Sequence, residues 1–592
     1  MRKSKLLFNF FFATLVVNAS MAQLTPFEKS GGTQTATYFE AIDFYRILAK
    51  NSKMVTILSH NDLETDSGYP FQIVFISSAD TSSIKGWHTT IFSDTSTKED
   101  RRKPSDIKIM INNGIHPGEP DGIDATMMLT RDIVNGKIPL PQNVTIVIVP
   151  IYNIGGSLNR NNTTRVNQNG PLSYGFRGNA QNLDLNRDFT KVDSKNARSF
   201  TRLFHAIDPD ILIDNHVSDG ADYQHTMTLI STQSDKLGGP IGSFLKTTFE
   251  PALYDGMHQK GWDMTPYVNF ETASPSKGME QFYDPPRYSS GYAALFQTMS
   301  FMPETHMLKP FKDRVKSTYD LMVTMIECAT KYSYEIDVAK ISTREMISEA
   351  KSLPLSWKVD SSQSSQIIFK GYEQAYKTST ATGLQRMYYD HAKPYEAKVK
   401  YYNVFKPENE IIKPRAYIIP VGWWAVTDLL KLNSVEMQEL KADTNILVEA
   451  YRIIDYKPSL RAYEKHHKNS NVQTSSSTKM MHFLKGDHII YTGQKNDRYL
   501  VEMLEPTGDD SFFSWNFFDA VLQQKEGYSD YRWEDIAGEE LNNNPHLKLL
   551  LDEKRKKDPA FAKNNTAQLE FIYKNSKYYE SAHMQYPVFR LN

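Results

Sequence analysis

The chain has 592 residues, 40% of them hydrophobic and 12% aromatic, so it can bury more than one sizeable core. Its formal net charge of -1 argues against a general electrostatic attraction to nucleic acid or to an anionic membrane, and we expect no nucleic-acid partner. The single cysteine, Cys328, excludes a disulfide within the chain and is expected to be a buried helical residue rather than a nucleophile.

The first 22 residues have the composition of a secretory signal peptide. Three basic residues among the first five precede an apolar run over residues 6–17, and Ser20-Met21-Ala22 offers small residues for cleavage. The apolar run is short for a membrane span, which argues against the alternative of an uncleaved anchor helix. We therefore expect an exported protein, periplasmic or extracellular, without a stable membrane anchor after cleavage.

From residue 37 to residue 334 the sequence alternates between strand patterns and helix patterns. Short apolar runs predict buried strands, and apolar residues three and four apart predict helices. This alternation is typical of an α/β domain with a mixed, mainly parallel central sheet flanked by helices. The predicted strands cover residues 71–76, 107–111, 144–150, 211–214 and 227–230, and the predicted helices cover residues 37–50, 121–134, 197–207, 241–253 and 312–334.

The sequence pattern changes at about residue 342. The polar, Ser-rich segment over residues 468–479 predicts a loop or linker, and the stretch over residues 546–573 predicts helix. We divide the chain into a signal peptide (1–22), a first domain (23–341) and a β-rich accessory domain with terminal helices (342–592), which is expected to aid folding, cover part of a cleft or contact large substrates. Its short aromatic or β-branched runs predict strands over residues 367–369, 397–405, 416–421, 448–456 and 488–492.

The tight turn His116-Pro117-Gly118-Glu119 lies between a predicted strand and a predicted helix. An imidazole and a carboxylate at this spacing can bind one zinc ion, and a catalytic zinc takes a third ligand, often a second histidine. His216 follows the predicted strand over residues 211–214. Because ligands bind at the carboxyl ends of strands in such sheets, we expect His116, Glu119 and His216 to meet there.

With these three residues in place, the chain resembles the zinc carboxypeptidases of the M14 (funnelin) family. Their motifs are His-x-x-Glu, Asn-Arg, His and a late Glu, and all four occur here in that order within residues 37–334. The resemblance implies the zinc carboxypeptidase fold and one zinc ion per chain, bound by His116, Glu119 and His216. It also implies that Asp184 orients a ligand histidine, although an aspartate in a loop also commonly forms an Asx-turn.

The resemblance further assigns the residues that handle substrate. Asn186 and Arg187 match the pair that holds the free α-carboxylate, for which a guanidinium fork is suited; the alternative is a structural salt bridge from Arg187 to Asp188 or Asp184. Glu304 matches the general base that takes a proton from the attacking water and passes it to the leaving amine. A surface glutamate at a strand end is the alternative interpretation of Glu304.

Two family positions have several candidates here. The arginine that stabilises the oxyanion lies upstream of the Asn-Arg pair, where both Arg165 and Arg177 qualify. We prefer Arg177, because it is closer to that pair and is flanked by glycines. The family tyrosine that caps the substrate lies in a loop before the catalytic glutamate, and we assign it to Tyr288, with Tyr283 and Tyr292 as the other candidates. Arg287 in the same loop could equally bind a substrate carboxylate.

Together with the predicted signal peptide, the resemblance implies an exported zinc metallocarboxypeptidase that acts on peptide or protein C-termini, with cell-wall peptides as one option. The Asn-Pro-Asp-Gly turn of the family is Asn153-Ile154-Gly155-Gly156 here, and the loop that follows is long. Both departures shape the rim of the cleft, and so bear on substrate specificity more than on the chemistry. The same site would also serve a peptidoglycan-peptide amidase or a deacylase of N-acyl amino acids, and a non-catalytic binding protein on a peptidase fold is the remaining alternative. The other histidines of the first domain are expected to be structural, and His466-His467 is expected to be solvated.

Overall fold

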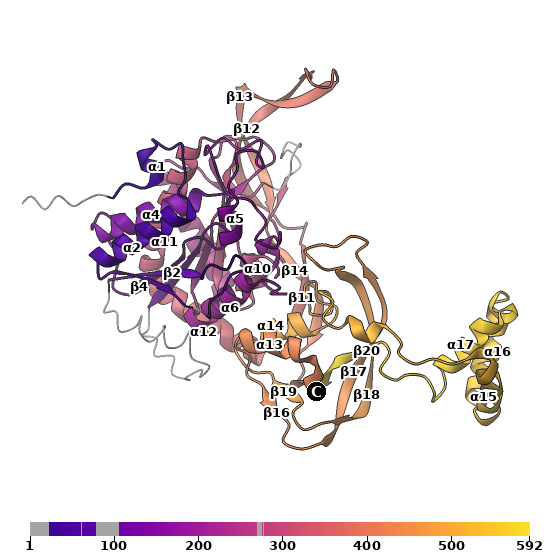
Figure 1. The fold of residues 1–592 in the computed structure, drawn as a ribbon. Coiled ribbons are helices and arrows are strands. Elements are labelled where there is room, and N and C mark those ends of the chain that lie inside the picture. The colour runs from indigo at the N-terminus through magenta and orange to yellow at the C-terminus, as the bar shows by residue number, and fades with distance from the viewer. Residues whose placement is uncertain (1–22, 61, 79–105, 269–274, 276–277) are drawn as a thin grey trace, which may run out of the picture.

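The computed structural model describes residues 23–60, 62–78, 106–268, 275 and 278–592 (Figure 1). The predicted signal peptide, residues 1–22, lies outside this part of the chain. Among the helices of the described residues, none combines the length and the apolar character that crossing a membrane requires.

The first half of the chain is built on one sheet of nine strands. All five strands that the sequence predicts there are present. Across the sheet the strands are β1 (Val55–Ser59), β2 (Gln72–Ser77), β4 (Val144–Val149), β3 (Ile107–Asn112), β5 (Ile211–Asp214), β10 (Met299–His306), β7 (Met227–Ser231) and β8 (Thr265–Pro266), and β6 (His216–Ser218) pairs with β10.

The sheet is mixed, as the sequence predicts, and its centre is parallel. Strand β3 runs parallel to β4 and β5, and β5 runs parallel to β10. Antiparallel pairs lie on both sides of this centre, between β2 and β4 and between β10 and β7. The carboxyl ends of β3, β5 and β10 therefore meet at one edge, where ligands bind in sheets of this kind.

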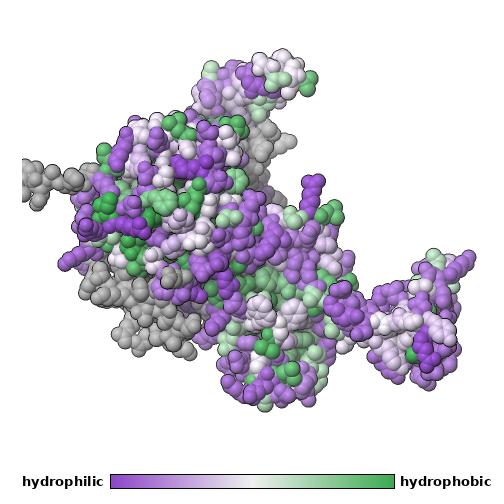
Figure 2. Space-filling model, viewed as in Figure 1, coloured by the Kyte–Doolittle hydropathy of each residue, from purple (hydrophilic) through white to green (hydrophobic). Residues whose placement is uncertain are grey.

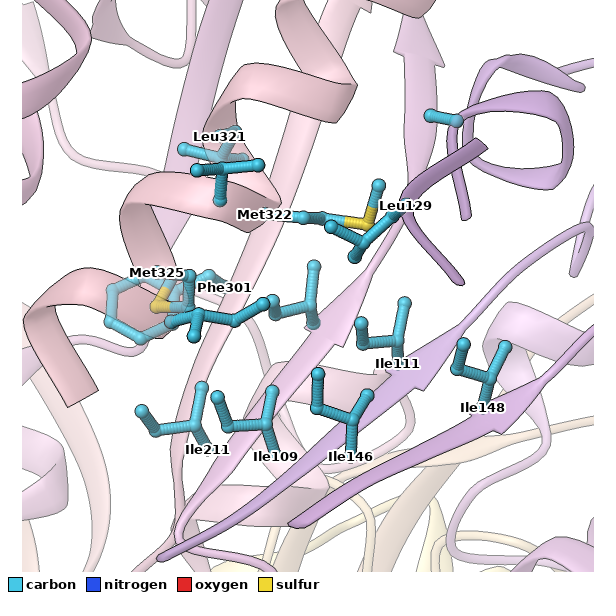
Figure 3. Packing of buried hydrophobic residues seen from close by; sticks show 14 of the residues in the cluster. Ile109, Ile111, Leu129, Ile146, Ile148, Ile211, Phe301, Leu321, Met322 and Met325 are labelled. Carbon is cyan, nitrogen blue, oxygen red and sulfur yellow. The ribbon is translucent and has the colours of Figure 1, made fainter. Parts of the chain in front are cut away.

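Both faces of the sheet are buried, which explains why its strands are nearly continuous apolar runs. On one face Ile109, Ile111 and Ile211 pack against Leu129 and Met322 (Figure 3). Each such side chain contributes about 1.5–3 kcal/mol when fully buried. Among the helices that contribute to this core are α2 (Tyr38–Asn51), α4 (Asp121–Val134), α8 (Gly239–Phe244), α9 (Glu250–Gln259), α11 (Phe311–Lys331) and α12 (Ser333–Glu349).

The C-terminal region covers part of the opposite face. Met110 and Leu212 of the sheet share a core with Leu430 and Leu500 of that region. The two halves of the chain are therefore joined by a common apolar core. The helices of this layer are α6 (Lys195–Ile207), α10 (Ser289–Ala294), α13 (Trp424–Leu432) and α14 (Asp497–Leu504).

The C-terminal region is β-rich, as predicted. A long hairpin of β12 (Ser365–Thr378) and β13 (Gln385–Tyr402) projects from the molecule (Figure 1), and β13 also pairs with β9 (Met279–Glu280). Strand β11 (Ser352–Val359) pairs with β14 (Phe405–Ile412). A six-stranded sheet contains β16 (Gln438–Glu439), β19 (His488–Tyr491), β15 (Ala416–Ile419), β20 (Gln585–Leu591), β17 (Thr444–Pro458) and β18 (Asn469–Phe483), in that order.

The prediction of a loop or linker over residues 468–479 is wrong, because all of these residues except the first belong to β18. This strand lies at the edge of its sheet and pairs with β17 over most of the length of both strands. Most of its side chains are exposed, so its sequence carries no alternation of polar and apolar residues. The backbone ladder with β17 determines the structure here, and a single-sequence pattern does not show it.

Three helices near the C-terminus form a separate small unit: α15 (Asp530–Asn543), α16 (Pro545–Lys557) and α17 (Asn565–Lys574). The sequence predicts the last two and misses the first. Trp533, Leu551 and Leu569 belong to a core of their own. The unit lies apart from the sheets, and the surface that it shows in Figure 2 is mostly hydrophilic.

Candidate active site

Three predicted metal ligands converge at the carboxyl edge of the sheet. His116 and Glu119 lie in the turn between β3 and α4, and His216 is the first residue of β6. The Nδ1 atom of His116 is 3.3 Å from Oε1 of Glu119, and Nδ1 of His216 is 3.1 Å from Oε2 of the same carboxylate. All three residues are buried, and one ligand atom from each lies within 4.8 Å of the others, so they can share one metal ion.

Two further carboxylates orient the two imidazoles. The Nε2 atom of His116 is 2.9 Å from Oδ1 of Asp184, and Nε2 of His216 is 3.1 Å from Oδ2 of Asp214. Asp184 and Asp214 can each accept a hydrogen bond from Nε2, which leaves Nδ1 of each imidazole, beside Glu119, as the nitrogen that can face a metal ion. Asp214 was missed by the sequence analysis, although a carboxylate two residues before a ligand histidine at a strand end is a usable signal.

The electrostatics of this group suit a bound cation. Burial alone would raise the pKa of Glu119, but His116 and Arg165 outweigh it and hold that pKa well below its usual value. Burial alone would lower the pKa of His216, but Asp214 and Glu119 outweigh it and raise that pKa. Two imidazoles facing a buried carboxylate form the donor set that zinc and similar ions take in proteins.

Glu304 lies inside β10, directly beside His216 in the parallel pairing of β10 with β6. It is half-buried, and it is not one of the three grouped ligands. Its pKa is raised to about 8, because burial and the neighbouring carboxylate of Glu119 outweigh the opposite effect of His216 and the two arginines. The surface strand-end interpretation of Glu304 does not match this position.

The structure brings both candidate oxyanion arginines to the same place. Nη1 of Arg165 donates to Oε1 of Glu119 at 2.8 Å, whereas Nη1 of Arg177 is 3.6 Å from that oxygen. Arg177 also donates from Nε to Oδ2 of Asp184 at 2.9 Å. The side chain of Arg177 is 45% exposed and that of Arg165 is 16% exposed, so Arg177 is the more accessible of the two.

Asn186 and Arg187 lie in a short 3₁₀ turn, η1 (Leu185–Arg187), beside the metal ligands. Nδ2 of Asn186 is 3.4 Å from Nε2 of His216, and Nη1 of Arg187 donates to the carbonyl oxygen of Asn186 at 2.8 Å. Asp188 bonds instead to Lys191 at 2.9 Å, and Asp184 is 4.0 Å from the Arg187 guanidinium. The structural salt bridges considered from sequence are therefore absent or long.

The three candidate tyrosines lie in different surroundings. The guanidinium of Arg187 lies 4.2 Å from the ring centroid of Tyr288. Tyr292 is fully buried and its hydroxyl donates to Oδ1 of Asn433, so it belongs to the core. Tyr283 stacks on Phe405 of β14, with ring centroids 5.7 Å apart.

Two further sequence predictions are changed by contacts with the C-terminal region. The guanidinium of Arg287 is paired with Asp510 at 2.6 Å, so it is already engaged by a carboxylate of the protein. The prediction that the pair His466-His467 is solvated is wrong for His466, whose Nε2 is 2.8 Å from Oδ2 of Asp193. His467 is exposed.

The loop that contains His466 also reaches the predicted substrate residues. Nε of Arg187 donates to the hydroxyl of Tyr463 at 3.0 Å, and the backbone N–H of Asp184 donates to Oε2 of Glu464 at 2.8 Å. These pairs are 276 and 280 residues apart in the sequence, and no local pattern marks them. The C-terminal region therefore borders the candidate site.

No family model matches the chain. It is 22% identical over 511 residues to carboxypeptidase 2 of Trichophyton equinum, which covers 82% of this chain and 85% of that protein, and 21% identical over 509 residues to carboxypeptidase 2 of Trichophyton rubrum, with the same coverage. A putative carboxypeptidase structure from Burkholderia mallei is 16% identical, with a TM-score of 0.36 over 50% of this chain and 68% of that one. The structure of carboxypeptidase A from Helicoverpa armigera is 13% identical, with a TM-score of 0.35 over 50% of this chain and 74% of that one.

The similarity to the Trichophyton carboxypeptidases extends along most of both chains. Together with the buried His-Glu-His group, it supports a metallopeptidase, which is the class of hydrolase that the sequence predicts.

Proposed function

We propose that the chain is a zinc metallocarboxypeptidase of the M14 type, which removes residues from the C-termini of peptides or proteins. The observation that carries this proposal is the convergence of His116, Glu119 and His216 with Glu304 at one edge of the sheet. The Asn186-Arg187 pair beside this group supports an exopeptidase over an endopeptidase, because a guanidinium fork suits a free carboxylate.

The residues of the group fit zinc. One nitrogen of each imidazole and the carboxylate of Glu119 would be three protein ligands, which leaves a fourth position open in a tetrahedral catalytic site. When bound, zinc would supply a Lewis acid that acidifies water and polarises the carbonyl of the scissile bond. Asp184 and Asp214 hold the two imidazoles in the orientation that this role needs.

Glu304 is proposed to move the proton. Its carboxylate would take a proton from the attacking water and deliver it to the nitrogen of the leaving amine. The partly buried position beside Glu119 raises its pKa and so favours the protonated state between these two steps. Arg177 is proposed to stabilise the oxyanion, while the less exposed Arg165 stays hydrogen-bonded to Glu119.

Substrate is proposed to lie against η1 and α10. Arg187 and Asn186 would hold the terminal carboxylate, with the ring of Tyr288 against the guanidinium. The basic, apolar and small-residue pattern of residues 1–22 supports export to the periplasm or the cell exterior.

Metal removal tests this proposal. We expect the full-length chain to hold one zinc ion, and His116→Ala to lose most of it, because three protein ligands become two. Metal content measured by atomic emission should fall in parallel with hydrolysis of free-acid peptides, and chelated wild-type protein should regain activity when zinc is restored. His258→Gln, at an exposed histidine on α9, is the matched control and should keep its metal. Full hydrolysis by metal-free protein would contradict the proposal.

A further inference from the structure

Tyr463 brings the C-terminal region into contact with Arg187. It lies in the loop between β17 and β18, and its hydroxyl oxygen accepts a hydrogen bond from Nε of Arg187 at 3.0 Å. Two residues of the same loop are bonded to the first half of the chain, Glu464 to the backbone N–H of Asp184 at 2.8 Å and His466 to Asp193 at 2.8 Å. The loop is thus attached at three adjacent points.

The ring of Tyr463 packs against a buried aromatic residue. It stacks on the fully buried Trp515, with ring centroids 6.2 Å apart and an interplanar angle of 18°. The ring of His466 contacts the same indole edge-on at 5.7 Å. These contacts hold the Tyr463 hydroxyl in place, although the residue itself is 38% exposed and so accessible to a ligand.

Tyr463 and Arg187 each keep a hydrogen-bond donor that no acceptor of the described residues uses. Because the hydroxyl of Tyr463 accepts from Nε, its own proton is available to donate. Nη1 of Arg187 is bonded to the carbonyl oxygen of Asn186. Within the described residues, neither the Tyr463 hydroxyl proton nor Nη2 of Arg187 has a hydrogen-bond acceptor. Two neighbouring donors, one of them cationic, match the two oxygens of a carboxylate.

We propose that Tyr463 binds the terminal carboxylate of the substrate together with Arg187, so that the C-terminal region completes the substrate site of the first domain. This inference rests on the proposed function, since it names a further residue for the same ligand. It gives the C-terminal region a defined part in recognition of peptides with a free C-terminal carboxylate. The loop is also connected to His116, because Glu464 is bonded to the backbone of Asp184, whose carboxylate contacts that histidine.

Binding measurements on an inactive background test this proposal. The full-length chain with Glu304→Gln, supplied with zinc, is titrated calorimetrically with one hexapeptide as the free acid and with the same hexapeptide as the C-terminal amide. Adding Tyr463→Phe removes only the hydroxyl and keeps the ring on Trp515. We expect it to weaken binding of the free acid about 10-fold, as for loss of a hydrogen bond to a charged group, and to leave binding of the amide unchanged.

Tyr451→Phe in the same background is the matched control. Its hydroxyl also accepts from an arginine, Nη1 of Arg590 at 2.5 Å, but in the six-stranded sheet. It should bind both peptides as the parent does.

Equal affinity of the parent and the Tyr463→Phe protein for the free acid would overturn the inference, as would a parent that does not prefer the free acid. Hydrolysis by the chain with Glu304 intact is measured separately. A failure of the proposed carboxypeptidase activity therefore shows as absent hydrolysis, while the titrations still decide the role of Tyr463.

Discussion

Glu304→Gln is expected to lower kcat for hydrolysis of a C-terminal peptide bond by a factor of about 10²–10⁴, the range that general acid–base catalysis contributes. Glutamine has nearly the shape of glutamate but cannot take a proton from water. Glu304 is not among the three residues that can share a metal ion, so the variant should keep its zinc. Steady-state kinetics together with metal analysis of the same preparation would measure both effects.

Glu250→Gln provides the matched control for this substitution. Glu250 is a second carboxyl group whose pKa is raised by burial, and it accepts a hydrogen bond from Oγ of Ser231 at 2.7 Å at the end of β7. It has no contact with the metal group, and we expect its kcat to stay near that of the wild type. If Glu304→Gln turned over substrate as fast as Glu250→Gln, the assignment of Glu304 as the general base would be wrong.

Arg187→Met is expected to raise KM for free-acid peptides by about 100-fold, because bonds to a charged partner contribute up to about 3 kcal/mol. Methionine retains an unbranched apolar stem against Tyr288 and removes the guanidinium. Amidated peptides lack the carboxylate and are not expected to be cleaved, so they are measured as competitive inhibitors, and their Ki should change little. KM for the free acids and Ki for the matched amides would separate these two effects.

Arg198→Met, on α6, is the control for general effects of removing an arginine. Arg198 pairs with Asp428 at 2.7 Å on the surface, and both side chains are more than 40% exposed. Its substitution should leave KM for the free acids and Ki for the amides unchanged, as is usual for surface ion pairs. An equal loss of affinity for free acids and for amides in Arg187→Met would assign Arg187 a structural role.

Five of the nine strands of the sheet, and the meeting of His116, Glu119 and His216, could be predicted from the sequence. The strands are buried on both faces, so each is a nearly continuous apolar run, and His116, Glu119 and His216 follow the ends of two such runs. The His-x-x-Glu spacing places two ligands in one turn, and the order of the later motifs selects His216. These signals are local, and the topology of parallel strands brings them together.

The remainder of the site depends on contacts that no local pattern encodes. Tyr288 and Tyr292 are four residues apart in one loop-helix segment, yet one lies at Arg187 and the other is in the core. Tyr463 and Glu464 reach the site only because β17 and β18 place their connecting loop there, and β18 itself was predicted as a loop. Its exposed edge position removes the alternation from which a strand is recognised.

The most direct test of the account is mass spectrometry of zinc-loaded protein incubated with matched peptides that carry free or amidated C-termini. The proposed carboxypeptidase should shorten the free acids one residue at a time from the C-terminus and leave the amides intact. Internal cleavage, or equal attack on both sets, would contradict recognition of the terminal carboxylate by Arg187. No cleavage of either set would contradict the carboxypeptidase assignment itself.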